Sequence, residues 1–218
     1  MNQSSVAGRR VLFIMATDHE YGPQLRMRMT PLITGVGPIE AAIGTSAHLQ
    51  QLQAADELPD LVVSLGSAGS RRCALGRVYQ IGEVSWRDMD ASRIGFAKGV
   101  TPFTDHPAVM KLPTPLRDVP CASLSTGSDI VGGDEYAQID ADLVDMETFA
   151  VLRACQTFGV PMIGLRGVSD GPEDLNELSG WTELLPLLDE RLAMAVDQLS
   201  HFLSGTSSYA PRLPRSAD

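Results

Sequence analysis

The sequence predicts an α/β fold in a single domain, with a twisted, mixed central sheet flanked by helices. Short apolar runs rich in β-forming residues alternate along the chain with longer segments of helical period, which is typical of this class. The composition agrees, since 218 residues with 44% hydrophobic and 20% charged side chains describe a globular chain that can bury one substantial core. We therefore expect a compact fold of enzyme size.

Seven runs have the length and composition of strands. They are residues 11–16, 31–34, 61–65, 82–86, 122–125, 143–144 and 161–168.

Three segments between or after these runs are predicted to be helices. The first follows Gly37-Pro38, because proline suits the first helical position. The second follows Glu147 and stops at Gly159, a residue type that often ends helices. The last spans about Trp181–Leu203, and Pro186 near its start leaves two alternatives, a kinked first turn or a regular helix that begins only there.

The folded domain is expected over residues 9–204. Residues 1–8 are small and polar, and residues 205–218 are rich in Ser and Pro, so both ends are expected to be flexible. No internal repeat and no linker divides the part between them.

Composition and spacing argue against several classes of function. A net charge of −10 has the wrong sign for a nucleic-acid partner. The apolar run 11–16 is far shorter than the roughly 20 residues that span a membrane, so we expect no membrane partner and no signal peptide. Three cysteines without paired spacing favour the cytoplasm, and the histidines lack metal-ligand spacing. The turn 35–37 lacks the third glycine of a dinucleotide fingerprint, because Glu40 stands at that position. From the histidine spacing we predict no metal, and from this turn we predict no cofactor.

Polar and acidic residues gather where predicted strands end, which is where an open α/β sheet places its ligand. The four segments are 16–20, 66–69, 144–147 and 166–170. Glu20 in the first of them, taken alone, has the alternative of a solvated loop charge.

Each of the other three segments allows a functional and a structural interpretation. The glycines of 66–69 allow a ligand to approach the backbone, but they also suit an ordinary tight turn. Asp145 and Glu147 stand at a strand-to-helix junction, where a carboxylate can bind a vicinal diol or cap the helix. Asp170 ends a buried strand, where it can hold a proton near neutral pH or act as a turn residue.

Taken together, these segments resemble the nucleoside phosphorylase superfamily, and most closely its hydrolytic branch, the 5'-methylthioadenosine/S-adenosylhomocysteine nucleosidases. In that family a first strand ends in Ala-Met-Glu-Glu-Glu, a Gly-Ile-Gly turn opens a helix, and Gly-Ser-Ala-Gly, Val-Glu-Met-Glu and Arg-x-x-Ser-Asp follow. This chain has the matching segments in the same order, at residues 16–20, 35–37, 66–69, 144–147 and 166–170. The resemblance covers roughly residues 10–203, and it implies a nucleoside phosphorylase-like fold.

The resemblance also implies roles for individual residues. Glu20 matches the residue that activates the attacking water, and Asp170 matches the acid that protonates the adenine leaving group at N7, with Ser169 orienting it. Glu147 matches the carboxylate that binds the ribose hydroxyls. The remaining substrate-binding residues expected are Met146 at the sugar, Ser67 and Arg166 beside the water, Ile130 and Val131 at the adenine, and Gly69 and Asp145.

The function implied is hydrolysis of the N-glycosidic bond of 5'-substituted adenine nucleosides, with a purine nucleoside as small-molecule partner and a homodimer as the assembly. Two alternatives stay open. One is a phosphorylase of the same fold that binds phosphate through Arg71 and Arg72, although a carboxylate at position 20 would repel phosphate. The other is a nucleoside-binding module without catalysis. The short segment 21–34 and the stretch 127–130, which lacks the family's aromatic residue, leave the 5' substituent undetermined.

Overall fold

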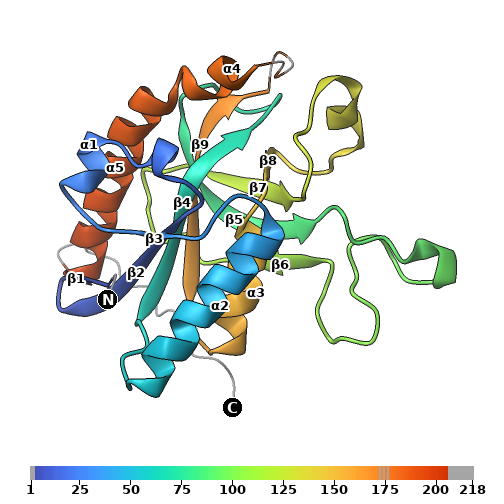
Figure 1. Ribbon diagram of the computed structural model, residues 1–218. Helices are drawn as coiled ribbons and strands as arrows, with labels where there is room; N and C mark the ends of the chain where they lie inside the picture. Colours follow the sequence, from blue (N-terminus) through green and yellow to red (C-terminus); the bar gives the residue numbers. More distant parts are fainter. Residues whose placement is uncertain (1–2, 172, 174, 176, 206–218) are drawn as a thin grey trace.

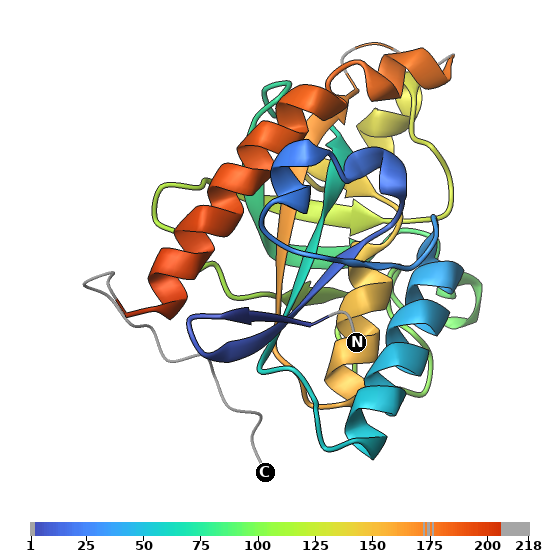
Figure 2. The ribbon, with the colours of Figure 1, turned by 60° about the vertical axis from the view of Figure 1, so that its left-hand side comes forward.

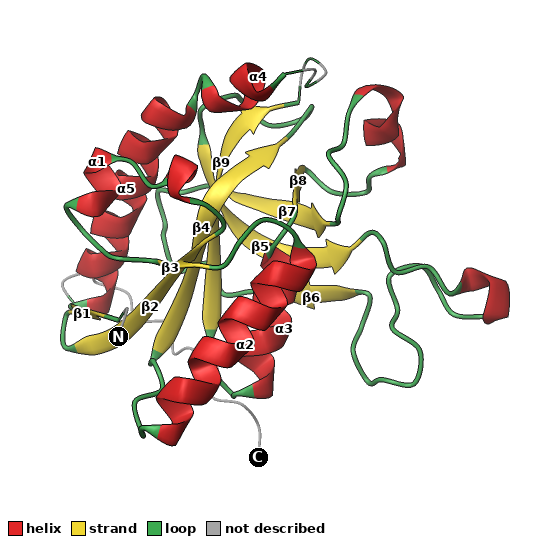
Figure 3. Cartoon of the chain, in the orientation of Figure 1, coloured by secondary structure: helices red, strands yellow, loops and turns green. Residues whose placement is uncertain are grey.

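The computed structural model of the chain describes residues 3–171, 173, 175 and 177–205. Within these residues, nine strands form one sheet in the order β1-β2-β4-β8-β7-β5-β6, with β3 paired to β2 and with β9 between β4 and β5 (Figures 1 and 3). Parallel pairs such as β4 with β9 occur beside antiparallel ones such as β5 with β6, so the predicted mixed α/β fold is confirmed. The strands are β1 (Ser4–Val6), β2 (Arg9–Met15), β3 (Leu32–Ile33), β4 (Leu61–Gly69), β5 (Val78–Trp86), β6 (Val109–Lys111), β7 (Cys121–Thr126), β8 (Leu143–Asp145) and β9 (Met162–Asp170).

Helices cover both faces of the sheet, as Figure 2 shows. They are α1 (Pro23–Arg26), α2 (Pro38–Ala54), α3 (Thr148–Thr157), α4 (Leu178–Thr182) and α5 (Leu185–Leu203), with short 3-10 turns η1 (Asp18–Glu20), η2 (Ser92–Ile94) and η3 (Gly133–Gln138). No helix in the described part of the chain is both long enough and apolar enough to cross a membrane.

The two faces of the sheet build two apolar cores. Along β2, Leu12 and Ile14 point into the core that α2 and α3 cover, whereas Phe13 and Met15 point into the core that α1 and α5 cover. Successive side chains of a strand face opposite sides, so a strand buried on both sides is apolar throughout. This explains why the predicted strands appear in the sequence as continuous apolar runs.

The structure contains all seven predicted strands and extends several of them. The glycine-rich segment 66–69, with its alternative of a tight turn, continues β4 alongside β9, with an irregular register at Ala68/Gly69. Strands β1 and β6 were not predicted, because each has only three residues and neither forms an apolar run. Strand β1 lies in the segment 1–8 that was expected to be flexible. Residues 1–2 and 206–218 lie outside the described residues.

The three predicted helices are present, and one of them begins later than expected. Helix α2 starts at Pro38 after Gly37, and α3 ends before Gly159, whose φ of 66° is the left-handed conformation that favours glycine. The long C-terminal helix begins at Leu185 with Pro186 in its first turn. The alternative of a regular helix that begins only there is confirmed, and a continuous helix from Trp181 is wrong. Proline suits the first turn of a helix, where its missing N–H has no partner to lose, and Trp181 belongs to the separate short helix α4.

Candidate active site

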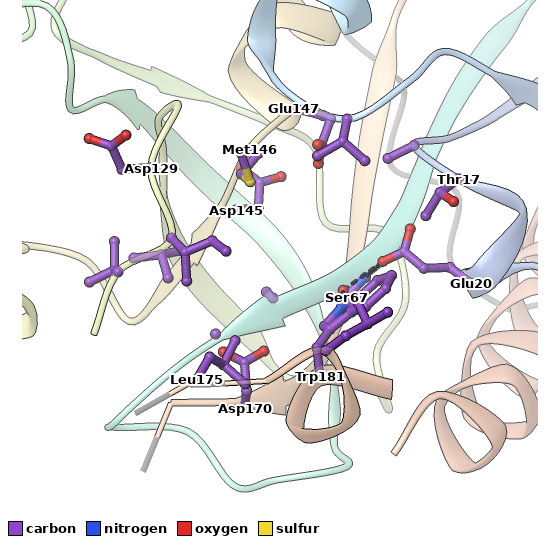
Figure 4. Close-up of a pocket in the computed structure, with 18 of the residues that line it drawn as sticks. Thr17, Glu20, Ser67, Asp129, Asp145, Met146, Glu147, Asp170, Leu175 and Trp181 are labelled. Carbon is purple, nitrogen blue, oxygen red and sulfur yellow. Dashed lines mark hydrogen bonds between the residues drawn. The ribbon is translucent and has the colours of Figure 1, made fainter. Parts of the chain in front are cut away.

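A cavity of about 520 Å³ opens at the carboxyl ends of β4, β8 and β9 (Figure 4). All four strand-end segments singled out in the sequence contribute side chains to it, together with the loop 129–131 and with Leu175, Glu177, Leu178 and Trp181. The parallel strands β2, β4 and β9 bring their carboxyl ends to one edge. Strand β8 runs antiparallel to β4 but pairs with it only at Gly69 and Val144, so the carboxyl ends of these two strands also meet there. Among the described residues, no group of three or more His, Cys, Asp or Glu side chains is placed to bind a metal ion.

Glu20 lies in the wall of this cavity, where η1 turns it inward, and it is only 8% exposed. Its Oε1 accepts hydrogen bonds from the backbone N–H of Ser67 at 2.7 Å and from the Ser67 hydroxyl at 2.6 Å. Burial raises the pKa of Glu20, while the two bonds from Ser67 act in the opposite direction by stabilising the ionised form. The alternative of a solvated loop charge is therefore wrong.

Glu147 occupies the N-cap position of α3, but its side chain does not cap that helix. Instead, its Oε1 accepts a hydrogen bond from the backbone N–H of Gly37 at 2.9 Å, and the side chain lines the cavity. Burial and the negative charge of Asp145 raise the pKa of Glu147 to about 7. The helix-cap alternative thus does not describe this carboxylate, which is available to a ligand.

Asp145 and Arg166 form a buried ion pair of 3.0 Å beside Glu147. The Asp145 carboxylate also accepts bonds from the Thr126 hydroxyl at 2.6 Å and from the backbone N–H of Thr148 at 3.0 Å. A buried pair is tolerated when hydrogen bonds satisfy both partners, as they do here. Asp145 is therefore an anchor of the β8–α3 junction rather than a free acceptor for a sugar.

Asp170 ends β9 and reaches the cavity beside Gly69. Ser169 donates its hydroxyl to Asp170 Oδ1, and burial raises the pKa of Asp170 despite that bond. A methyl group on Gly69 would lie 2.9 Å from Asp170 Oδ2, so glycine is required for this close approach of β4 to the acid. The arrangement favours a carboxyl group that keeps its proton more readily than a free aspartate.

Comparisons with known proteins show the family of this chain. A model described as the phosphorylase superfamily matches residues 133–200. The 5'-methylthioadenosine/S-adenosylhomocysteine nucleosidase of Actinobacillus succinogenes is 33% identical over 176 residues, which covers 72% of this chain and 73% of that protein. The chain belongs to this nucleosidase family. The same enzyme of Haemophilus influenzae is 32% identical over 174 residues, with the same coverage.

Solved structures agree with this family's fold. The Neisseria meningitidis nucleosidase in complex with methylthio-immucillin-A has a TM-score of 0.69 at 18% identity, covering 89% of this chain and 98% of that one. A futalosine hydrolase mutant of Helicobacter pylori has a TM-score of 0.72 at 17% identity, covering 87% and 97%. At these identities the likeness describes the fold alone.

Nine of the eleven site residues predicted from the sequence line the cavity of this nucleosidase-family chain. They are Glu20, Ser67, Gly69, Ile130, Val131, Asp145, Met146, Glu147 and Asp170. The other two, Arg166 and Ser169, lie buried behind the wall, where each donates a hydrogen bond to a lining aspartate. For Arg166 this differs from the expected place beside the water.

Sequence reasoning missed Arg87, which supports the loop expected to bind adenine. Its guanidinium lines the cavity and donates to the backbone carbonyls of Ser125 at 2.6 Å, Asp145 at 3.0 Å and Asp129 at 2.5 Å. Next to it, Asp88 accepts bonds from the backbone N–H and the hydroxyl of Ser128 at 2.7 and 2.8 Å. Arg87 directly follows β5, so the strand-end rule that located the other segments could have found it.

Trp181 was also missed as a site residue, because its spacing suits the apolar stripe of the last helix. In the nucleosidase-family cavity it forms part of the wall, and its indole N–H donates to the Ser67 hydroxyl at 2.9 Å (Figure 4). No local pattern in the sequence connects it with Ser67.

Proposed function

We propose that this chain hydrolyses the N-glycosidic bond of 5'-methylthioadenosine and S-adenosylhomocysteine, releasing adenine and the ribosyl sugar. The observation that supports this most directly is that three carboxyl groups from separate segments, Glu20, Glu147 and Asp170, line one cavity. Such a reaction passes through an oxocarbenium-like sugar and a purine that leaves poorly as an anion. It needs a base for the water, an acid for the purine and a group that positions the ribose.

The surroundings of Glu20 and Asp170 suit opposite roles. Burial raises the pKa of Glu20, but two hydrogen bonds from Ser67 oppose this shift and favour the ionised form that takes a proton from water. Asp170 receives one from Ser169, and burial favours the protonated form that donates to N7 of the base. Each transfer contributes about 10²- to 10⁴-fold to the rate in enzymes that use a positioned acid or base.

Glu147 is assigned to the sugar. An ionised carboxylate can accept hydrogen bonds from both hydroxyls of a vicinal diol, and its charge opposes the positive charge that develops on the ribose ring. Met146 lies next to it in the wall, and Ile130 and Val131 line the part of the cavity that we assign to adenine. Arg87 and Asp88 fix the loop that presents these two residues.

Hydrolysis is favoured over phosphorolysis by the charges around the cavity. Neither Arg71 nor Arg72 is among the lining residues, and Arg71 donates to the backbone carbonyl of Gly171 at 3.0 Å. Arg87 does line the cavity, but its bonds go to backbone carbonyls. A buried Glu20 at the position of the nucleophile suits a neutral water and repels a phosphate dianion.

We further propose a cytoplasmic homodimer, as the family resemblance implies. Ile39 and Ile43 lie one turn apart on α2 and are 68% and 61% exposed. Val36, which precedes them, is 53% exposed and also lines the cavity. An exposed apolar face that reaches the cavity is suited to contact with a second copy.

Product analysis tests the reaction. The purified protein is incubated with methylthioadenosine, adenosylhomocysteine, adenosine and inosine, with and without phosphate, and the sugar product is identified. Free ribosyl sugar that forms without phosphate supports hydrolysis. Sugar 1-phosphate that forms only with phosphate would instead identify a phosphorylase, and binding without cleavage would identify a binding module.

A further inference from the structure

Three side chains from distant segments form a directed chain of hydrogen bonds at the cavity wall. Trp181 Nε1 donates to Ser67 Oγ at 2.9 Å, and Ser67 Oγ donates to Glu20 Oε1 at 2.6 Å (Figure 4). The Trp181 ring is held from behind by the apolar core that α5 covers, and from the side by His19, whose ring centroid is 6.2 Å away in an edge-on contact. The indole donor at the start of the chain is therefore half-buried between this core and the His19 ring.

The chemistry of these groups sets the direction of the chain. An indole N–H can only donate, whereas a serine hydroxyl has one proton and two lone pairs. When the indole occupies a lone pair of Ser67 Oγ, the hydroxyl proton is left for the carboxylate of Glu20. Successive hydrogen bonds also polarise one another, so the indole strengthens the bond that Ser67 gives to Glu20.

We propose that Trp181 is a positioning residue for catalysis: through the Ser67 hydroxyl it orients Glu20 and stabilises the ionised form that accepts a proton from water. This inference rests on the proposed hydrolytic function and extends it to a residue on α4. Both bonds from Ser67 end on Oε1 of Glu20. The proton taken from water would therefore go to Oε2.

Other charged groups near Glu20 also shift its pKa, independently of Trp181. The positive charge of Arg166 lowers the pKa of Glu20, and the negative charge of Asp145 raises it. Glu20 in turn helps to raise the pKa of Glu147. None of these groups bonds to Trp181, so a change at the indole should leave their contributions in place.

The alternative is that Trp181 is only an apolar wall. A double-mutant cycle separates the two roles. Trp181→Phe keeps an aromatic ring and removes the N–H, while Ser67→Ala removes the hydroxyl and keeps the backbone bond to Glu20. We expect W181F alone to lower kcat about two- to tenfold, the effect of losing one hydrogen bond, and to change kcat no further in the S67A background. If Trp181 were only an apolar wall, W181F would cause the same loss of activity in the wild-type and the S67A proteins, and the change would be mainly in KM.

The pKa of Glu20 gives a readout that does not require turnover. It is measured by carbon-13 NMR titration of side-chain carboxyl groups, with the Glu20 signal assigned from E20Q. We expect W181F and S67A each to raise this pKa, and the double variant to raise it no more than S67A alone. The control is Trp86→Phe, because the Trp86 indole N–H has no hydrogen-bond partner in the described structure and its ring stacks on Phe149.

The outcomes separate the two proposals. A wild-type protein that releases no adenine would overturn the proposed function, while the NMR titration would still decide whether Trp181 acts on Glu20. If W181F leaves the titration of Glu20 unchanged, or shifts it no more than W86F does, the positioning role is refuted.

Discussion

The backbone N–H of Gly37 and the carboxylate of Glu147 join the starts of two helices at the cavity, with 2.9 Å between N and Oε1. Gly37 is the N-cap of α2 and Glu147 that of α3. Helix N-termini favour negative charge, yet the pKa of Glu147 is raised to about 7 because burial and Asp145 outweigh that effect. Glu147 thus keeps its proton to a higher pH than a free glutamate does.

Replacing Glu147 by Gln is expected to lower kcat/KM for methylthioadenosine by about 10- to 100-fold, as when a hydrogen bond to a charged group is lost. The amide can still bond one hydroxyl, but it lacks the charge that opposes the oxocarbenium ion. Steady-state kinetics with a parallel melting curve measure this effect. The control is Glu40→Gln, an exposed change on α2, and unaltered kinetics in E147Q would assign Glu147 a purely structural role.

The same substitution should change how stability depends on pH. The carboxyl of Glu147 has a pKa of about 7 when folded, against about 4.3 for an unfolded glutamate. A raised folded pKa gives a stabilising contribution that is full below about pH 4 and is lost as the pH rises through 7. Relative to wild type, E147Q should therefore gain stability between pH 4 and pH 8, by at most about 4 kcal/mol. Urea unfolding across this range measures the difference, and a constant difference would contradict the raised pKa.

Asp170→Asn is expected to abolish cleavage of adenine nucleosides and largely to spare a p-nitrophenyl riboside. The lost step is protonation of the departing base, which a nitrophenolate does not need. Initial rates on both substrates, at unchanged melting temperature, give the comparison. Equal losses on the two substrates would leave Asp170 as a structural residue.

Glu20→Gln should impair both substrates to a similar degree. Water must be activated whichever group departs, and an amide cannot accept the proton. The pair of variants thus separates the acid from the base within one assay. Retention of p-nitrophenyl riboside cleavage in E20Q would exclude Glu20 as the base.

Light scattering should give a mass of about twice the 23.4 kDa chain at assay concentration. Charged residues at both Ile39 and Ile43 should then produce monomers, because the apolar face of α2 would no longer bury a contact. Gln50→Glu, on an exposed turn of the same helix, is the matched control. A fully active wild-type monomer would refute the dimer.

The sequence predicted the sheet well because its strands are buried on both faces. Such strands are apolar throughout, so runs like 161–168 stand out without any knowledge of their neighbours. The short edge strands β1 and β6 lack this signal. The segment 66–69, with glycine at both ends, also lacks a continuous apolar run and resembled a turn, although pairing with β9 keeps it in a strand.

The sequence located those residues of the candidate site that lie at the end of a strand. It did not locate residues whose placement depends on contacts with distant parts of the chain. Asp170 ends β9 and Glu147 follows β8 by two residues, and both strands are buried, so the position of each residue at a strand end was visible in the sequence. The burial of Glu20 depends on Ser67, 47 positions away, and the inward placement of Trp181 depends on the break before Pro186. Arg166 was expected to contact the ligand because it lies near the end of a strand. In the structure its guanidinium instead forms a buried ion pair with Asp145.

The side chains of Arg87 and Asp88 hold the loop 127–131, which we assign to the base, so this loop and the end of β5 form one structural unit. Its residues 127–131 take their shape from partners about forty positions earlier, and a methyl group on Gly127 would come within 2.4 Å of Arg87 Nε. Anyone who grafts this loop from a relative to alter base selectivity would therefore need to transfer the end of β5 with it. The exchangeable unit is the pair of segments, and a loop moved alone would lose the frame that holds its shape.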